Sequence, residues 1–488
     1  MSEIDKPNVS VPLVASFNQR GLAGYTQAVT NSDDQIKLNS IYEPIQNAAT
    51  GKNTLYLSKR PGVKLLTGTW GTSSQISYLH DIDVDGAGPV LFYTVGDDII
   101  TENGASTLIT TAAGYAPAFV DKTMLANDVY LVLQLRNSTG GMTHWLSNNL
   151  AVGFTQFTTS AGSDRGKMEF LDGYAFTTDV NDGGQIYNSQ LNTLSTWPAS
   201  NFVTRRAKLD QATGLGRFGS QLISWGTASM EVYRNAGTPF GSPLEFVPSL
   251  TQEYGLERVD VVGMRHYYAI VGGKLYWKGA NPHGVFAYNG QTVEKVSSLA
   301  VDKILAERQH YFIGPLGFSG QVALVIGLDL VTAATQRSLL FFPAWKDWFL
   351  WTSTVFIPQA NPRDDNLFLG VSSNQHRLYS LHTSSNVFTD AGTNYEWLHQ
   401  FKLPKPGNGF QRLDMFGLMG DTATAALNIS TQFSFDDWGS LTSGRVIDMT
   451  SHDKRITRCG GMRTPVGVRL SYTGTESVRL EAAIARIT

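Results

Sequence analysis

Short runs of alternating apolar and polar residues, joined by turn-forming pairs, recur along most of this chain. The stretch 266–298 contains two such runs: Gly272-Gly273 interrupts the first, and Asn289-Gly290 has the composition of a two-residue hairpin turn. Because period-two alternation is typical of half-buried strands, the pattern predicts an all-β fold. The same strand–turn–strand pattern occurs at 89–111, 129–155, 171–197, 220–247, 338–354 and 376–390.

These units recur at irregular intervals of roughly 40–50 residues, which is the period of β-propeller blades rather than of helical solenoids. We therefore expect a β-propeller-like repeat domain over residues 66–395, with about six or seven irregular blades. Residues 1–65 are predicted to form an extended N-terminal arm, which does not fold alone because its apolar residues are dispersed. Residues 396–488 alternate like a small C-terminal β-sandwich, with a linker-like stretch at 403–409.

One segment has helical rather than strand periodicity. In 297–309, Ser297 or Ser298 can cap the N-terminus, and Val301, Ile304 and Leu305 fall on one face. The sequence therefore predicts a single short amphipathic helix among the strands.

Composition supports the same fold class. The chain has 488 residues, of which 42% are hydrophobic, only 16% are charged and 48 are glycine, a balance that favours two or three domains of short strands and turns. The formal net charge of −3 argues against a protein that grips DNA through its phosphates, but not against a surface past which DNA slides. The lone Cys459, the lack of a signal-peptide pattern and the shortness of the apolar run 322–328 indicate a soluble protein of a reducing compartment.

The stretch 430–441 contains the residue types of the S-x-D-x-G-x-x-W box found in sialidase-like propellers. Ser434, Asp436, Asp437, Trp438 and Gly439 stand in a different order, and the box occurs once, outside the predicted blades. We therefore interpret it as a β-hairpin in which the aspartates cap turn amides, not as part of a catalytic site.

Residues 80–92 resemble the start of a calcium-binding loop. Asp81, Asp83, Asp85 and Gly86 match the D-x-D-x-D-G positions, but Phe92 stands where the bidentate glutamate belongs. The alternatives are a weak calcium site and a polar turn, and the missing ligand favours the turn.

Other motifs carry little chemistry. A literal G-x-G-x-x-G at 214–219 lacks the preceding apolar strand and the following helix of a dinucleotide site. The nine histidines are scattered without the spacing of metal ligands. The sequence therefore predicts no catalytic residues, no cofactor-binding site and no firm metal site.

Basic residues concentrate near the end of the chain. Residues 443–488 hold eight Lys or Arg against four Asp or Glu. Arg455, Arg458 and Arg463 are therefore candidates for an interface with an acidic partner subunit or with DNA backbone. The alternative is a solvated face of the sheet.

Several segments together resemble one protein family. They are 41–66, which includes Lys59-Arg60-Pro61-Gly62, together with 172–197, 223–257, 273–305 and 459–471. In their order the chain resembles the tail hub, or nozzle, proteins of short-tailed bacteriophages, also called packaged-DNA stabilisation proteins. The resemblance covers nearly the whole chain and implies a virion protein without enzymatic activity and without cofactors.

The resemblance also implies partners. Such proteins form a homo-oligomeric ring, usually a hexamer, beneath the head-to-tail adaptor and portal complex. The ring continues the channel, retains the packaged double-stranded DNA and lets it pass on ejection without specific binding. It carries or borders tail spikes, fibres or a needle. The expected location is the virion tail, assembled in the cytoplasm of the bacterial host without a membrane anchor.

Two other functions stay open at this stage. A glycan-binding or glycan-cleaving tail propeller would present a pocket with paired carboxylates at separations suited to hydrolysis. A monomeric interaction propeller would bind peptides on a concave face rimmed by aromatic residues.

Overall fold

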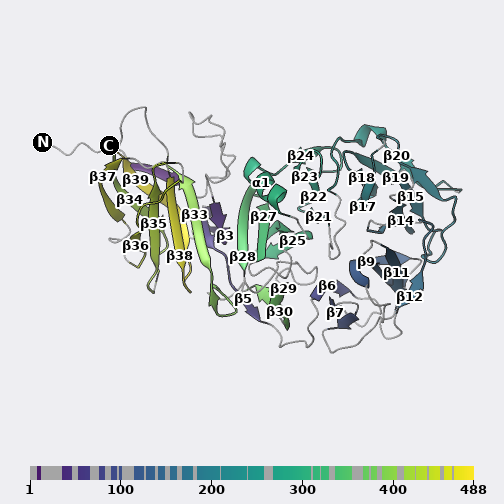
Figure 1. Ribbon diagram of the computed structural model, residues 1–488, viewed down its shortest axis with the longest axis horizontal. Helices are drawn as coiled ribbons and strands as arrows, with labels where there is room; N and C mark the ends of the chain where they lie inside the picture. The colour runs from purple at the N-terminus through teal and green to yellow at the C-terminus, as the bar shows by residue number, and fades with distance from the viewer. Residues whose placement is uncertain are drawn as a thin grey trace. The chain divides into compact units, whose positions relative to one another are not determined.

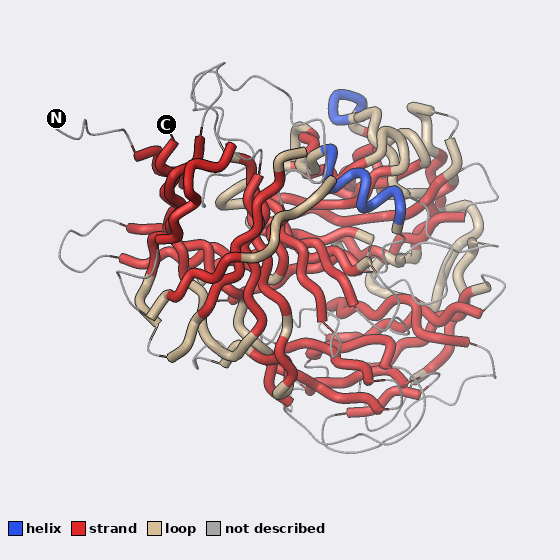
Figure 2. Tube along the Cα trace, turned by 60° about the vertical axis from the view of Figure 1, so that its left-hand side comes forward, coloured by secondary structure: helices blue, strands red, loops and turns tan. Residues whose placement is uncertain are grey.

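A computed structural model gives the structure of this chain. β-Strands predominate throughout its described residues (Figures 1 and 2), which confirms the predicted all-β, propeller-like fold class. The structure describes residues 8–12, 36–46, 53–65, 76–82, 90–95, 98–101, 115–125, 128–137, 141–148, 154–161, 167–179, 184–208, 210–238, 240–257, 267–308, 312–318, 320–328, 336–353, 367–372, 375–381, 387–403, 412–423, 425–436, 439–450, 456–463 and 467–487.

The chain divides into two compact units that do not follow sequence order. The propeller unit comprises residues 69–332 and 358–377. The arm unit comprises residues 1–68, 333–357 and 378–488. This division differs from the three consecutive segments that the sequence suggests, because strands of the N-terminal arm pair with strands from residues 333–357 and from the C-terminal region.

The propeller unit consists of small antiparallel sheets in which consecutive strands are neighbours. Each sheet can bury its faces only against adjacent sheets, as in propeller blades. The sheets are β6-β7-β8 (Ile76–Ile82, Val90–Val95, Asp98–Thr101), β9-β10-β11-β12 (Tyr115–Leu125, Asp128–Asn137, Met142–Ser147, Thr155–Phe157), β13-β14-β15-β16 (Glu169–Leu171, Tyr174–Asp179, Gln185–Asn188, Phe202–Thr204), β17-β18-β19-β20 (Ala212–Phe218, Gln221–Gly226, Met230–Asn235, Leu244–Phe246) and β21-β22-β23-β24 (Tyr268–Val271, Lys274–Gly279, Gly284–Tyr288, Val293–Lys295).

The remaining elements of the propeller unit are few. They are the hairpin β25-β26 (Phe312–Phe318, Gln321–Gly327), the strand β29 (Leu367–Ser372), the 3-10 helix η1 (Pro248–Leu250) and the helix α1 (Leu299–Glu307). The helix confirms the sequence prediction: the Ser298 side chain accepts from the amide of Val301, and Val301 and Leu305 are buried.

Two-residue turns close several of the hairpins. Gly272 and Gly273, with φ of 53° and 74°, link Val271 directly to Lys274 in the register of β21 and β22. Positive φ at both positions defines the primed turn that matches strand twist, and glycine adopts it without strain. The prediction of a two-residue turn at Asn289-Gly290 is wrong. Four residues separate Tyr288 from Val293, and the Asn289 side chain accepts from the amides at positions 291 and 292.

An aromatic core joins neighbouring sheets of the propeller unit. Trp225 of β18 lies 5.6 Å from Trp277 of β22 between ring centroids, and both are fully buried. The G-x-G-x-x-G glycines make room for this core: a Cβ at Gly216 would lie 2.6 Å from the Trp225 ring, and one at Gly214 would lie 3.0 Å from Tyr267. Gly214 and Gly216 therefore serve the packing of β17 against these aromatic rings.

The arm unit contains three sheets. The first has the order β3-β4-β39-β34-β37, with β1 beside β39 (β1 Asn8–Pro12, β3 Ser40–Gln46, β4 Asn53–Lys59, β34 Arg412–Gly420, β37 Ile456–Arg463, β39 Arg479–Ile487). The second includes β27-β28-β2-β33-β38-β35-β36 (Gln336–Phe342, Asp347–Ser353, Ile36–Leu38, Glu396–Lys402, Gly467–Thr473, Asn428–Ser434, Arg445–Asp448). The third contains β30-β5-β31-β32 (Gln375–Leu381, Val63–Leu65, Thr389–Asp390, Thr393–Asn394).

Strands of the N-terminal arm are integral to these sheets. β2 lies between β28 and β33, and β4 pairs with β39 near the end of the chain. β5 pairs with β30 and β31. The pairing partners of β2 and β5 all come from residues beyond 346, so these arm strands are built into sheets with later parts of the chain.

Candidate functional site: buried charged clusters

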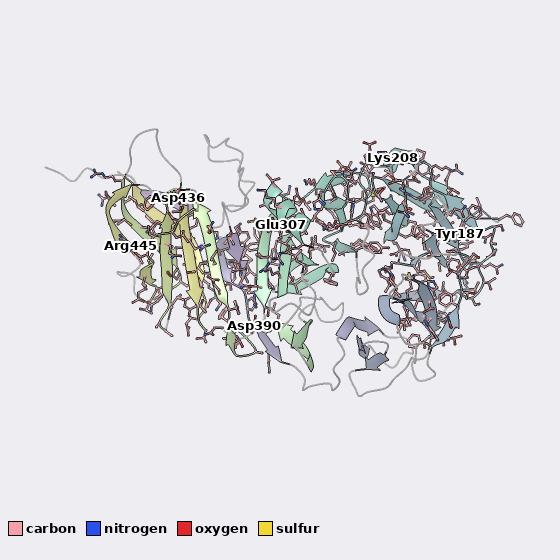
Figure 3. The ribbon with its side chains drawn as sticks, viewed as in Figure 1. Tyr187, Lys208, Glu307, Asp390, Asp436 and Arg445 are labelled. Atoms are coloured by element: carbon pink, nitrogen blue, oxygen red, sulfur yellow. The ribbon has the colours of Figure 1, made fainter. Side chains whose placement is uncertain are left out.

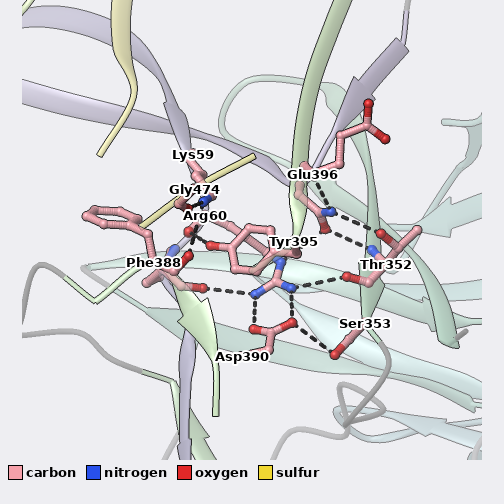
Figure 4. A network of polar contacts seen from close by, with 11 residues as sticks. Lys59, Arg60, Thr352, Ser353, Phe388, Asp390, Tyr395, Glu396 and Gly474 are labelled. Atoms are coloured by element: carbon pink, nitrogen blue, oxygen red, sulfur yellow. Dashed lines mark hydrogen bonds and ion pairs between the residues drawn. The ribbon is translucent and has the colours of Figure 1, made fainter. Parts of the chain in front are cut away.

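The motif Lys59-Arg60-Pro61-Gly62 brings two cations into the interior of the arm unit (Figure 4). Arg60 is fully buried, and its Nη1 and Nη2 donate to the two carboxylate oxygens of Asp390 at 2.9 and 2.5 Å. This bidentate pairing is the strongest geometry available to an arginine–carboxylate pair. It links residues that lie 330 positions apart in the sequence.

Arg60 also binds three other parts of the unit. Its Nε donates to Asn39 Oδ1 at 3.0 Å, and its Nη2 donates to the carbonyl oxygen of Thr352 at 3.1 Å. The Tyr395 ring centroid lies 3.8 Å from the guanidinium carbon. One side chain therefore connects the β2–β3 junction, β28, β31 and the start of β33.

Lys59 binds carbonyl groups on the other side of the motif. Its Nζ donates to the carbonyl oxygens of Phe388 at 3.0 Å and Gly474 at 2.5 Å, and it lies 4.3 Å from the Tyr395 ring centroid. Burial, and then the adjacent Arg60 charge, lowers the pKa of Lys59 to about 8. Gly62 is required for the close approach of β31, since a Cβ there would lie 2.1 Å from the Thr389 carbonyl oxygen.

A second buried cluster lies between β2, β3 and β28. The Lys37 ammonium pairs with Asp347 and donates to the Tyr42 hydroxyl at 2.7 Å. Tyr42 in turn donates to Asp347 at 2.5 Å, and burial together with the Asp347 charge raises the pKa of the Tyr42 hydroxyl. The three groups satisfy one another where water has little access.

His399 of β33 stands opposite Lys37 in the strand register and is buried, with its ring stacked on Phe401 at 5.2 Å. Burial, reinforced by the Lys37 charge, lowers the pKa of His399 to about 3. An unfolded histidine titrates near 6.5, so the stabilisation from a neutral His399 is complete above that pH and is lost as the pH falls from about 6.5 toward 3. We expect His399→Gln to flatten the pH dependence of unfolding in this window, by up to about 1.4 kcal/mol per pH unit.

Urea denaturation of the wild type and of His399→Gln at pH 7, 6, 5 and 4 measures this effect. The difference in free energy of unfolding between the two proteins should shrink or reverse as the pH falls. Parallel pH profiles would show that His399 does not couple folding to protonation.

The propeller unit has its own buried clusters. Lys167 lies between Asp121 at 2.7 Å and Glu169 at 3.2 Å, and the Tyr268 hydroxyl donates to Glu169 at 2.7 Å. Burial is the main cause that raises the pKa of Glu169, to about 7. The neighbouring Tyr267 hydroxyl donates to the Leu215 carbonyl oxygen at 2.6 Å, so the cluster ties β9, β13, β17 and β21 together.

A further cluster surrounds the fully buried Glu231 of β19. Its carboxylate accepts from the backbone amides of Arg206 and Ala207 at 3.1 and 2.9 Å and from the Tyr233 hydroxyl at 2.6 Å. Arg205 pairs with Asp210 at 3.1 Å beside it. The polar groups thus hold the 205–210 connection against the β18–β19 hairpin.

In all of these clusters the charged groups bind other parts of the same unit, which is the arrangement that makes buried charge tolerable. In the part of the chain that the structure describes, no three His, Cys, Asp or Glu side chains lie together as metal ligands. Over the same residues, no helix has the length and apolar character needed to cross a membrane. The charged groups in these clusters therefore stabilise the fold by linking segments of their own unit.

Asp436 of the sialidase-like box, whose position Figure 3 labels, caps a turn. The Asp436 carboxylate accepts from the Ser440 amide at 2.8 Å, from the Ser440 hydroxyl at 2.6 Å and from the Ser434 hydroxyl at 3.2 Å. These bonds, chiefly those from Ser440, lower the pKa of Asp436. Asp436 therefore has the turn-capping role predicted from the sequence, while Asp437 and Trp438 lie outside the described residues.

Other predicted site residues are described little or not at all. Asp83, Asp85 and Arg455 lie outside the described residues. Asp81 belongs to β6, and Arg458 and Arg463 belong to β37. Only the backbone of these three residues is described. The calcium hypothesis and the three interface candidates therefore stay predictions.

Part of the basic C-terminal segment binds within the arm unit. Arg479 donates through Nε and Nη2 to the two carboxylate oxygens of Glu43 at 2.8 and 2.9 Å, and Arg469 donates to Gln400 at 3.2 Å. Arg445, at the start of β36, is partly exposed (Figure 3). The positive charge of this segment is therefore only partly available to a partner.

The arm unit also has an open groove of about 670 Å³. Glu476 is the single acidic residue among its described lining residues, so these do not supply the pair of carboxylates that glycoside hydrolysis uses. The lining residues are Asn394, Ala425, Ala426, Asn428, Ser430, Ser471, Tyr472, Thr473, Gly474, Thr475 and Glu476.

A comparison with models of known protein families finds a match in the part of the chain that forms the small sheets of the propeller unit. Residues 92–326 match the family model described as the β-propeller of bacteriophage P22 Gp10. Over these residues the chain is similar to the P22 Gp10 propeller family. The match lies entirely inside the propeller unit and includes the Trp225 core, the Lys167 cluster and the Glu231 cluster. The family resemblance inferred from the sequence is thereby confirmed for residues 92–326.

More distant comparisons add little to the P22 Gp10 assignment. No curated protein sequence matches the chain. Solved structures with a similar arrangement include the RRP9 WD40 repeats (9% identity, 67% of this chain and 100% of that one, TM-score 0.39), Kluyveromyces lactis Hsv2 (13%, 64% and 96%, 0.33) and the Aleuria aurantia lectin (11%, 64% and 94%, 0.30). Similarity at this level does not extend to function.

Proposed function

We propose that this chain is a structural protein of a phage tail that forms the hub, or nozzle, ring. In this role it assembles as a homohexamer below the head-to-tail adaptor and portal complex and continues the DNA channel. It retains the packaged genome, lets it pass on ejection, and borders tail spikes, fibres or a needle. The protein is a component of the virion and acts without enzymatic activity.

The observation that carries this proposal is the family match of residues 92–326 to the P22 Gp10 β-propeller. The build of both units is compatible with a mechanical role. Lys37, Arg60 and Glu231 are buried charged groups that bind other segments of their own unit, so each fixes the geometry of the fold. These buried hydrogen bonds and ion pairs within each unit favour a rigid structural protein.

Charge is also consistent with a channel through which DNA moves. The chain has 38 Lys or Arg and 41 Asp or Glu, so it lacks the basic excess of a protein that holds DNA phosphates tightly. A wall that releases the genome should attract phosphates weakly. Nonspecific, transient contact with DNA follows from this balance.

Native mass spectrometry of the purified full-length protein, alone and with purified portal–adaptor complex, tests the proposal. We expect the protein to form a hexameric ring or to bind the adaptor complex. Assembly should weaken at high salt, because salt screens the attraction between oppositely charged docking surfaces. A protein that stays monomeric and does not bind the adaptor complex would contradict the proposal. Hydrolysis of capsule polysaccharide would favour the glycan-cleaving alternative instead.

A triple variant tests the proposed interface within the same assay. Replacing Arg455, Arg458 and Arg463 together by Glu should abolish docking while the thermal unfolding profile stays unchanged. Arg234→Glu provides a matched control, because Arg234 forms an exposed pair with Glu245 in the propeller unit. Normal docking of the triple variant would assign the three arginines to a solvated face.

A further inference from the structure

The first strand of the chain has an unusual place in the arm unit. β1, residues Asn8–Pro12, pairs antiparallel with β39, from Asn8 opposite Arg486 to Pro12 opposite Ala482. Within the described residues β39 is its sole pairing partner. Its backbone pairing within the described residues therefore consists of a single line of hydrogen bonds.

β39 would have an open edge without this strand. One side of β39 pairs with β34 from Leu480 to Ile487. Among the described residues, the other side pairs with β4 at Arg479 and Leu480 and with β1 from Ala482 to Arg486. Ala483 and Ala485 are fully buried there. An unpaired edge of this kind is a template for any strand of suitable sequence.

The connection between β1 and the rest of the unit is long. Residues 13–35 separate β1 from β2, whereas residues 47–52 suffice to join β3 to β4. Fully extended, the longer connection could span roughly 75 Å. A connection of this length does not confine β1 to the β39 of its own chain, so β39 of an adjacent copy in a ring is also accessible to β1.

We propose that in the assembled ring β1 of each copy pairs with β39 of the neighbouring copy. This inference rests on the proposed ring. A ring needs a heterologous contact, in which one surface of a copy meets a different surface of the next copy. β1 and the β39 edge form such a pair, with the same hydrogen bonds as within one chain. Exchange around the ring would leave no edge unfilled.

Engineered disulfides distinguish exchange from pairing within one chain. Ser10 and Ile484 are directly opposed in the register, and Cys459 is the only natural cysteine. The variant Ser10→Cys/Ile484→Cys in a Cys459→Ser background is assembled, oxidised and run on a denaturing non-reducing gel. Exchange gives a ladder of covalent oligomers, because each copy is joined to two neighbours. A monomer with an internal disulfide overturns the inference.

Deletion of residues 1–12 gives an independent test. It decides between exchange and intrachain pairing even when the engineered disulfide does not form. Exchange predicts that the deleted chain, checked for an intact thermal transition, loses its rings and runs as a monomer. Rings that persist overturn the inference. The wild-type chain separates the two proposals: absence of rings in the wild type counts against the proposed function, whereas wild-type rings with intrachain disulfides count against strand exchange alone.

Discussion

Replacing Arg60 by alanine is expected to lower the free energy of unfolding of the arm unit by about 3–5 kcal/mol, because it leaves Asp390 buried without its main counter-charge. The loss extends beyond the ion pair. Asn39 and the Thr352 carbonyl oxygen each lose a guanidinium donor, and Tyr395 loses the cation stacked on its ring. Urea denaturation followed by tryptophan fluorescence measures the change, since Trp351 and Trp397 are buried in the same unit.

Two variants control for the removal of charge and of side-chain volume. Arg60→Lys keeps the positive charge but cannot form the bidentate pair, so an intermediate loss is expected. Arg479→Ala removes another bidentate arginine–carboxylate pair of the same unit, whose side chains are 32% and 30% exposed, and should cost about 1 kcal/mol or less. Equal losses for Arg60→Ala and Arg479→Ala would mean that burial does not set the strength of the Arg60 pair.

Local features of the fold could be predicted from the sequence because their causes are local. The helix at 299–307 follows from a serine cap and a 3.6-residue apolar pattern, both contained in one segment. The tight hairpin at Gly272-Gly273 follows from the tolerance of glycine for positive φ. At Asn289 the same reasoning failed, because an asparagine side chain can hydrogen-bond loop amides and so stabilise a longer turn.

Pairings between distant segments could not be predicted. Arg60 is recognisable as part of a motif, but nothing in the sequence identifies Asp390 as its partner. A usable signal does exist for such residues: Lys37, Glu231 and Lys278 are strand residues whose immediate neighbours in the sequence are apolar or glycine, and all three are buried. The same limit applies to the arm, since no local pattern indicates that its strands pair with strands beyond residue 346.

In the propeller unit, the largest effect is expected at Trp225. Trp225→Ala should lower the free energy of unfolding by about 3–5 kcal/mol, because a fully buried ring is replaced by a cavity. The ring lies within 6.3 Å of Trp277, Tyr267 and Tyr268, measured between centroids, and these side chains come from the neighbouring sheet or from the residue just before it. The cavity would therefore open between two sheets, where blade-like sheets obtain most of their stability.

Whether burial rather than aromatic character sets this loss is decided by two further variants. Trp225→Phe keeps a ring in the core and should retain a substantial part of the stability. Phe240→Ala removes an aromatic ring that is 91% exposed between β19 and β20, and should change the free energy of unfolding by no more than about 0.5 kcal/mol. Differential scanning calorimetry of the three variants against the wild type gives the comparison. A loss at Phe240 as large as that at Trp225 would contradict it, and so would a Trp225→Ala variant that melts like the wild type, because the core between these sheets would then not be what holds the propeller unit together.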